Sequence, residues 1–292
     1  MDRLTEVSES DATTTYALTR RVWEGRTACG TDVVIADSPA YGRMLFLDGE
    51  LQSAEADERV YHETLVHPVM AAARGARPAD APLRVLVVGG GEGATVREVL
   101  RWSDVVVDWV DIDADLVALC REHLGWWPAG ADEKVSYYGE DICTAWGHLR
   151  SDYNVVILDL PDPDGETGVL YSDAFWHEVV RHLAPDGWVA THCGPVRPFE
   201  NIGGGFQRIR EMTGDVEGRG FYRMGIPSFQ GDWGFWVWSR LSGASAWNFK
   251  TRFPVGLEVV DERQIAEWAN PARLWRRAVA AAVNETDSCR RR

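Results

Sequence analysis

The sequence predicts an α/β fold in which a doubly wound sheet, covered by helices on both faces, follows a small N-terminal β-domain. The first observation is the apolar run at residues 85–88, which precedes a glycine-rich turn and a segment of helical spacing at 96–101. The second is the alternation of strand-like and helix-like segments that continues to about residue 240. The third is a set of short alternating segments near the N-terminus, such as 31–37 and 43–49, which are typical of β-hairpins.

The glycine-rich turn is the most informative segment of the chain. It reads GGGEGAT over residues 89–95, and its glycines let the backbone approach a ligand where a Cβ would clash. The next strand, 105–110, leads to Asp111, which lies about 20 residues after the turn and can accept ribose hydroxyls. NAD enzymes and S-adenosylmethionine (SAM) enzymes share this pair of signals. Glu92 places a carboxylate at the helix start, which suits a cationic ligand better than a pyrophosphate; the alternative is that Glu92 only caps the helix.

We expect three segments along the chain. Residues 1–75 form an N-terminal β-hairpin domain that ends in a helix over 57–73, residues 76–240 form a Rossmann-like SAM-binding catalytic domain of the class I transferase type, and residues 241–292 form a C-terminal helical extension. The regular alternation indicates a parallel sheet. The extension carries expected helices at 262–268 and 271–283, and the final residues 290–292 are expected to be disordered. Strands of the sheet are expected at 85–89, 105–110, 135–139, 154–159, 187–192, 217–222 and 233–239.

Composition excludes several classes of protein. The sequence has no run of about 18 apolar residues and no apolar stretch at its start, which predicts a cytoplasmic protein without a membrane segment. The net charge of −15 argues against nucleic acid as a partner. The five cysteines are scattered and none forms a CxxC pair, so neither a disulfide framework nor a metal site is expected.

Four segments in the right order resemble the spermidine synthase family of aminopropyltransferases. They are LDGELQSAEADE at 47–58, YHE at 61–63, the turn at 89–95, and DLPDP at 159–163. The glutamate in the turn and the last motif are most similar to the thermospermine-synthase-like branch. The resemblance implies a small N-terminal β-domain, a SAM-type Rossmann domain and a homodimer.

The same resemblance implies which residues bind the cofactor. Asp111 would bind the ribose, and Asp141 would bind the adenine amine. The expected cofactor-binding set is Gln52, Gly89, Gly91, Glu92, Gly93, Asp111, Ile112, Asp141, Asp159 and Leu160.

The resemblance also implies the reactive centre. Gln52 and Tyr61 would border the reactive end of the cofactor, while Glu92 and Asp159 would hold its amino group. Asp159 would also accept a proton from the attacking amine. The chemistry requires such a base, because a sulfonium is already a good electrophile and catalysis consists mainly of alignment and proton removal.

The acceptor side departs from the family pattern. Phe229 stands where polyamine-transferring relatives generally have a tyrosine, and Arg223 places a cation nearby. Trp233 and Trp236 belong to an aromatic late strand, for which core packing is the default interpretation and a wall beside the substrate is the alternative. The expected substrate-binding set is Tyr61, Arg223, Phe229, Trp233 and Trp236.

These departures lead us to expect methyl transfer from SAM to an aromatic or indole-containing small molecule. The alternative is aminopropyl transfer from decarboxylated SAM to a polyamine, and a third interpretation is a non-catalytic nucleotide-binding protein. For methyl transfer the proton acceptor would be Asp159, Tyr61 or His62. His192 lies at the end of the fifth strand, in a stretch that contains Gln in relatives, and is a candidate auxiliary base.

Overall fold

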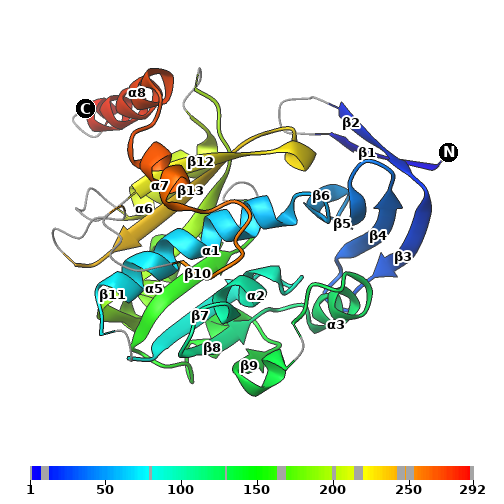
Figure 1. Ribbon diagram of the computed structural model, residues 1–292, viewed down its shortest axis with the longest axis horizontal. Helices are drawn as coiled ribbons and strands as arrows, with labels where there is room; N and C mark the ends of the chain where they lie inside the picture. Colours follow the sequence, from blue (N-terminus) through cyan, green and yellow to red (C-terminus); the bar gives the residue numbers. More distant parts are fainter. Residues whose placement is uncertain are drawn as a thin grey trace.

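The computed structural model describes residues 2–7, 13–78, 81–128, 130–162, 169–198, 202–213, 220–241, 247 and 253–289. Its N-terminal part consists of antiparallel strands in two small sheets (Figure 1). The two-stranded sheet is formed by β1 (Asp2–Val7) and β2 (Thr13–Leu18). The four-stranded sheet is formed by β3 (Arg20–Arg26), β4 (Asp32–Ser38), β5 (Gly42–Leu47) and β6 (Glu50–Ala54).

A seven-stranded sheet forms the centre of the molecule, in the order β12-β13-β11-β10-β7-β8-β9. Strands β9, β8, β7, β10 and β11 run parallel, whereas β13 is antiparallel to both β11 and β12. The predicted α/β class with an N-terminal β-domain is therefore confirmed. The strands are β7 (Leu83–Gly89), β8 (Val105–Val110), β9 (Val135–Tyr138), β10 (Tyr153–Asp159), β11 (Leu183–Pro195), β12 (Gly220–Ile226) and β13 (Gly231–Ser239).

One sequence prediction about this sheet was wrong, and one predicted strand ends later than expected. The sheet is mixed and not fully parallel, because β12 and β13 are joined by the single short turn η3 (Pro227–Phe229), and a connection that short can join only antiparallel strands. The strand expected at 217–222 is described from Gly220 and continues to Ile226, while residues 217–219 lie outside the described part of the chain. The tail at 290–292, which we expected to be disordered, lies outside the described residues.

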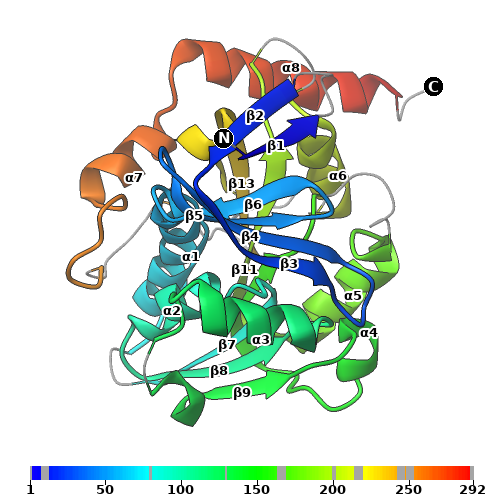
Figure 2. The ribbon, with the colours of Figure 1, turned by 90° about the vertical axis from the view of Figure 1, so that its right-hand side faces the viewer.

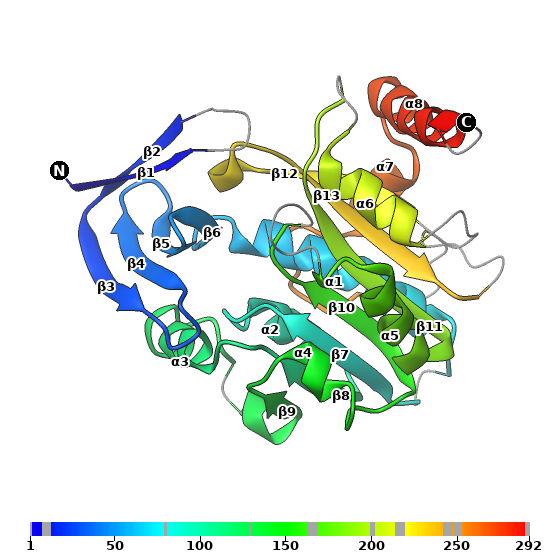
Figure 3. The same ribbon diagram turned by 180° about the vertical axis from the view of Figure 1, so that it is seen from behind.

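Helices cover both faces of the central sheet. On one face α1 (Glu58–Gly75), α2 (Ala94–Leu100) and α7 (Glu262–Ala269) pack on a core that includes Val85 and Ile157. On the other face α5 (Asp173–His182), α6 (Gly204–Thr213) and α8 (Arg273–Cys289), with the short α4 (Ile142–Ala145), cover Leu86 and Val156 (Figure 3). Neighbouring residues of a strand thus enter separate cores, as expected for strands that are buried on both sides.

The N-terminal domain stands at the end of the sheet where the parallel strands finish (Figures 1 and 2). Apolar side chains of β4 and β5, including Val33 and Leu45, pack on α3 (Ala114–His123) through Leu116 and Cys120. This contact places the four-stranded sheet beside the segment that follows β8.

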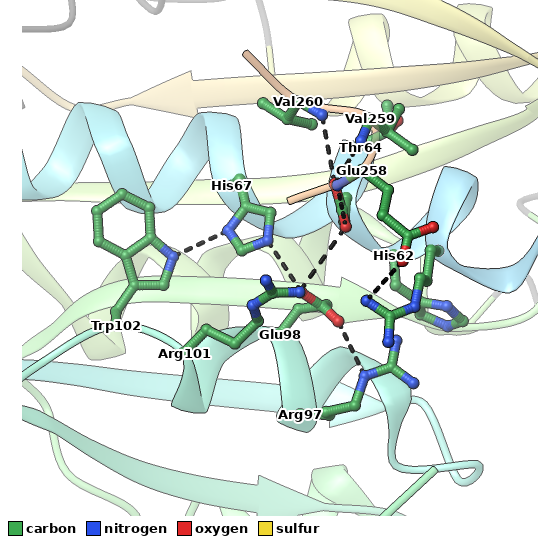
Figure 4. Close-up of polar contacts among 12 residues, drawn as sticks. His62, Thr64, His67, Arg97, Glu98, Arg101, Trp102, Glu258, Val259 and Val260 are labelled. Atoms are coloured by element: carbon green, nitrogen blue, oxygen red, sulfur yellow. Dashed lines mark hydrogen bonds and ion pairs between the residues drawn. The ribbon is translucent and has the colours of Figure 1, made fainter. Parts of the chain in front are cut away.

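A buried polar network ties α1 to α2 behind the glycine-rich turn (Figure 4). Glu98, fully buried, accepts from Nε2 of His67 at 3.0 Å and pairs with Arg97 and Arg101. His67 in turn accepts from the Trp102 indole at 3.0 Å. Although burial opposes ionisation, the hydrogen bonds and charges of His67 and Arg97 lower the pKa of Glu98 to about 2.

The same network holds the C-terminal segment against α1. Glu63, also fully buried, accepts from the backbone N–H groups of Glu258, Val259 and Val260 at 2.9–3.3 Å (Figure 4).

In the part of the chain that the structure describes, we find no helix that has both the length and the apolar character of a membrane span.

Candidate active site

The site lies where the strand order of the central sheet reverses, between β7 and β10. Gly89 at the end of β7 pairs in register with Asp159 at the end of β10. Open α/β sheets bind ligands at such a switch point, outside the carboxyl ends of the strands. The glycine-rich turn and Asp159 therefore meet at the position where a ligand is expected.

The turn has room only for glycine at its first two positions. Gly89 and Gly90 have φ of 79° and 67°, and a Cβ on Gly89 would lie 2.1 Å from the carbonyl oxygen of Asp159. A Cβ on Gly90 would lie 2.7 Å from Oδ2 of Asp159. The glycines thus let the turn pass directly over this aspartate before α2 begins, with Gly93 as its N-cap.

Three groups hold Asp159. The Tyr61 hydroxyl donates to Oδ1 at 2.8 Å, and the Thr95 hydroxyl donates to Oδ2 at 2.5 Å. The N–H of Gly90 donates to the backbone oxygen at 2.8 Å. Each carboxylate oxygen thus has a fixed partner, so the orientation of Asp159 is determined before any ligand binds.

Glu92 is tied to α1 through His62. Nε2 of His62 contacts Oε1 of Glu92, while Nδ1 contacts the backbone oxygen and Oε2 of Glu58 at 2.6 and 3.1 Å. Burial alone would lower the pKa of His62, but the carboxylates of Glu92 and Glu58 raise it well above its usual value. His62 is therefore an imidazolium between two carboxylates, and both of its nitrogens are engaged. This arrangement does not suit the base role that we considered for it.

Asp111 forms the second acidic position beside the turn. Its Oδ1 accepts from the N–H of Asp113 at 2.9 Å, and its Oδ2 lies 3.1 Å from where a Cβ on Gly91 would be. Burial, helped by the charges of Asp113 and Asp159, raises the pKa of Asp111 to about 6. Negative charge is thus concentrated on both sides of the glycine-rich turn.

The remaining expected cofactor residues surround these acids. Ile112 is exposed beside Asp111, and Leu160 is buried beside Asp159. Asp141 accepts from the N–H of Cys143 at 2.8 Å and caps α4, with its side chain otherwise exposed. Gln52 lies exposed on β6, where its amide contacts the oxygen of Glu50 at 3.5 Å.

Aromatic side chains form a wall next to Asp159, which we call the acceptor wall: Tyr61, Phe229 and Trp233. The Phe229 and Trp233 rings lie 4.8 Å apart, and Phe229 lies 6.2 Å from Tyr61. Phe229 is held in place because the N–H of Ser228 donates to Asp57 at 2.7 Å. Burial and the charge of Asp159 raise the pKa of Tyr61 well above its usual value, so its hydroxyl stays protonated and donates.

Arg223 and Trp236 do not join this wall. Arg223 pairs with Asp232 at 2.6 Å and lies 4.4 Å above the Trp275 ring, while Trp236 packs 5.6 Å from Phe206. Both face α6 and α8, on the other side of the sheet, and line a separate cavity of about 510 Å³. The expected grouping of Phe229, Trp233 and Trp236 is therefore corrected. Successive residues of β13 face opposite sides of the sheet, so positions 233 and 236, three residues apart, lie on opposite sides.

Two further residues of the site were not singled out from the sequence. Thr95 and Glu58 bind Asp159 and His62, respectively. The spacing of Glu58 and His62, four residues apart on α1, is a signal that could have identified the pair. Thr95 carried no comparable signal, because its partner is far away in the sequence. Among the described residues, no three His, Cys, Asp or Glu side chains come together as they would around a metal ion.

Comparison with known proteins decides the family. The model of the spermine/spermidine synthase domain matches residues 58–240. The chain belongs to this family. As a member of the spermine/spermidine synthase family, it is a transferase. A polyamine aminopropyltransferase 2 of Pseudomonas aeruginosa is 37% identical over 257 residues, which cover 84% of this chain and 70% of that protein.

Two further family members extend the comparison. A polyamine aminopropyltransferase of Aeropyrum pernix is 32% identical over 279 residues, covering 89% of this chain and 84% of its own. The crystal structure of a spermidine synthase in complex with the transition state analogue AdoDATO superposes with a TM-score of 0.84 at 21% identity, covering 96% of this chain and 95% of that one. The structural match supports the same fold.

Methyl transfer to an aromatic or indole acceptor, the reaction we expected from the sequence, was wrong. The similar members of the spermine/spermidine synthase family are polyamine aminopropyltransferases, and the relatives support aminopropyl transfer in place of methyl transfer. The structure removes one reason for that expectation, since Arg223 is neutralised by Asp232 and lies away from the acceptor wall.

Proposed function

We propose that this enzyme transfers the aminopropyl group of decarboxylated SAM to a polyamine. The observation that carries the proposal is the pair of carboxylates, Glu92 and Asp159, beside the glycine-rich turn. Burial and the charge of Asp159 raise the pKa of Glu92, although His62 opposes this, so the two acids act on one another electrostatically. A cation bound between two carboxylates reduces their mutual repulsion, and the aminopropyl group of the donor ends in an ammonium.

The same carboxylates argue for the decarboxylated donor. SAM carries a carboxylate next to its amino group, which would face the buried Glu92 and the half-buried Asp159. Decarboxylated SAM offers them only its ammonium. Like charges within a few ångströms in a buried site cost several kcal/mol by Coulomb's law, on the order of 4 kcal/mol at an effective dielectric constant of about 20.

The residues around the turn fit the rest of the donor. Asp111 would accept the ribose hydroxyls, and Asp141 would accept from the adenine amine. Ile112 and Leu160 offer apolar contacts to the adenine ring, while the tight backbone at Gly89 and Gly91 leaves space for the nucleoside. Gln52 and Tyr61 would border the reactive carbon.

The chemistry then needs alignment and one base. When bound, the sulfonium supplies an electrophilic carbon and a neutral thioether leaving group. The acceptor nitrogen forms the new C–N bond as the C–S bond breaks, and the bonding electrons of that C–S bond remain on sulfur. Asp159 would take the proton that the acceptor nitrogen loses, while the Tyr61 and Thr95 hydroxyls keep its carboxylate in place.

The acceptor wall suits the methylene chain of a polyamine. Phe229 and Trp233 present apolar surface, and Asp159 and Asp162 lie at the end of β10 to meet the ammonium groups. Phe229 lacks the hydroxyl of the tyrosine that polyamine-transferring relatives generally have. Packing against aromatic rings would therefore have to position the methylene chain of the polyamine.

Several expectations about this enzyme stay predictions. They are a homodimer, a cytoplasmic location, and the boundaries 1–75, 76–240 and 241–292 of the three segments. Size-exclusion chromatography with light scattering tests the first of these.

The function is tested with purified enzyme, decarboxylated SAM or SAM as donor, and a panel of di-, tri- and tetra-amines. Mass spectrometry is expected to find polyamines extended by one aminopropyl group, together with methylthioadenosine. The Asp159→Asn variant serves as the control for chemistry and should lose at least about 100-fold in turnover, the usual contribution of a positioned base. Absence of any extended polyamine would contradict the proposal.

A further inference from the structure

The loop between β3 and β4, residues 27–31, reaches from the N-terminal domain to the first turn of α3 (Figures 1 and 3). The hydroxyl of Thr27 donates to Oδ2 of Asp113 at 2.6 Å, although the two residues are 86 positions apart. The hydroxyl of Thr31 donates to the same oxygen at 3.1 Å. Thr27 and Asp113 are both buried. Two hydroxyls of the N-terminal domain thus hold one buried carboxylate of α3.

Two further hydrogen bonds order this loop against the helix. The hydroxyl oxygen of Thr27 also accepts from the N–H of Thr31 at 3.2 Å, which fixes the direction of the hydroxyl. The N–H of Ala28 donates to Oδ2 of Asp115, in the first turn of α3, at 2.9 Å. The loop therefore contacts the helix start through its backbone as well as through its two hydroxyls.

Asp113 connects the loop to Asp111. Its Oδ1 accepts from the N–H of Leu116 at 3.0 Å, so both of its carboxylate oxygens are bound. Its own N–H donates to Oδ1 of Asp111 at 2.9 Å. The other oxygen of Asp111 lies on the side of the glycine-rich turn, 3.1 Å from where a Cβ on Gly91 would be. Because the side chain of Asp113 is fixed at both oxygens, its N–H sets the direction in which the carboxylate of Asp111 points.

The N-terminal domain has other contacts that dock it on α3. Val33 and Leu45 pack in one apolar cluster with Leu116. The guanidinium of Arg43 donates to the backbone oxygen of His123 at the other end of the helix. These contacts do not involve the segment 111–113. Docking alone therefore does not require two hydroxyls on a buried carboxylate.

We propose that Thr27 and Thr31 are positioning residues of the donor site, which act through Asp113 to orient Asp111 toward the ribose. This inference rests on the proposed function, in which Asp111 accepts the ribose hydroxyls. A carboxylate that accepts from two neighbouring hydroxyls must point correctly, since hydrogen bonds weaken steeply as their angle departs from linearity. The N-terminal domain would thus contribute to donor affinity without touching the donor.

The first test measures binding of methylthioadenosine by calorimetry. Thr27→Val keeps the shape of the side chain but removes the hydroxyl, and should bind at least about fivefold more weakly than wild type. Thr27→Ser keeps the hydroxyl and should stay within about twofold of wild type. Thr213→Val is the matched control, since it removes another buried hydroxyl, which donates to Ile209 within α6 at 2.9 Å, and should leave the affinity unchanged.

The second test asks whether the effect acts on the ribose hydroxyls. Wild type should bind methylthioadenosine at least about tenfold more tightly than its 2′,3′-dideoxy analogue, and Thr27→Val should reduce this preference at least about threefold. The analogue has no ribose hydroxyls, so its affinity does not depend on the direction of Asp111. Thr31→Val gives the same comparison if Thr27→Val does not fold. An unchanged preference would overturn the inference, because the loop would then only dock the domain.

Steady-state kinetics separate this inference from the proposed function. With saturating polyamine, Thr27→Val should raise the KM for decarboxylated SAM at least about fivefold and change kcat less than about twofold. An unchanged KM with a lower kcat would contradict a role in donor binding. If wild type shows the expected ribose preference and extends no polyamine, the proposed reaction fails and the role of the loop stands. If wild type shows no ribose preference, the assignment of Asp111 fails and the inference fails with it.

Discussion

The Tyr61 hydroxyl donates a hydrogen bond of 2.8 Å to Oδ1 of Asp159, and thereby connects helix α1 to the end of strand β10. The ring of Tyr61 packs against those of His62, Phe229 and Phe235 at 5.0–6.2 Å. One side chain thus orients the proposed base with its polar end and forms part of the acceptor wall with its ring. This division of roles can be tested, because the two parts of a tyrosine can be changed separately.

Tyr61→Phe should lower kcat about tenfold and leave stability and donor affinity nearly unchanged. The ring and its packing remain, but Asp159 loses the donor that orients its carboxylate. Steady-state kinetics measure kcat, and calorimetry measures the affinity for the donor. Tyr153→Phe is the matched control, since it removes a 2.7 Å bond to Asp108 away from the site and should leave kcat unchanged. An unaltered kcat in Tyr61→Phe would contradict the positioning role.

Glu92→Gln should weaken the preference for decarboxylated SAM over SAM. The variant removes one of the two carboxylates that we propose attract the donor ammonium and repel the SAM carboxylate, so the ratio of the two affinities should fall about tenfold or more. Isothermal titration calorimetry with both donors gives the ratio directly. Glu122→Gln, at an exposed position, should not change it. A loss of equal size for both donors would show that Glu92 does not discriminate between them.

Asp111→Asn should make the ligand-free protein more stable at neutral pH and impair nucleoside binding. The folded-state pKa of Asp111, about 6, is above the value for an unfolded chain, so the folded protein binds this proton more tightly. The free energy of unfolding of wild type therefore falls as the pH rises from about 4 to about 6, and the destabilisation, about 3 kcal/mol, is complete above that range.

Asparagine does not ionise, so Asp111→Asn should exceed wild type in Tm at pH 7.5 and match it near pH 4. Asp113→Ala provides the contrast, because it removes the N-cap of α3 and should destabilise the protein at both pH values. Calorimetry with methylthioadenosine should find at least about tenfold weaker binding to Asp111→Asn. A Tm below that of wild type at pH 7.5 would rule out the assigned electrostatic penalty.

Glu98→Gln should destabilise the fold without abolishing activity. It removes the buried carboxylate that Arg97 and Arg101 share, although Arg97 keeps Glu58 and Arg101 keeps Glu63. Because these partners remain, the expected cost is below the ~3–5 kcal/mol of a fully broken buried pair. Because the pKa of Glu98 is lowered to about 2, its contribution is complete above about pH 4.5 and is lost as the pH falls toward 2. Urea unfolding measures the difference, with Glu178→Gln, from an exposed pair with Arg181, as a control expected within about 0.5 kcal/mol of wild type.

The sequence by itself determined the elements whose signals are local. The apolar run before the glycines predicted β7, the spacing after them predicted α2, and the order of the strands placed Asp111 and Asp159 at strand ends on the edge of the sheet. These predictions succeed because parallel strands of one sheet finish at the same edge, so their order along the chain already implies proximity. The motifs that resemble the family are also local, so the sequence alone was enough to predict the family.

The acceptor side was decided only by tertiary structure. Period-2 alternation places positions 233 and 236 on opposite faces of β13, but which face looks toward α1 depends on how both helical layers pack. The charge of Arg223 is neutralised by Asp232 on the next strand and covered by Trp275, some fifty residues later. The contacts of His192 likewise come from residues 160, 162, 194 and 233. The charge state and the direction of a side chain depend on the neighbours that folding brings to it. The spacing of residues along the sequence does not reveal which neighbours these are.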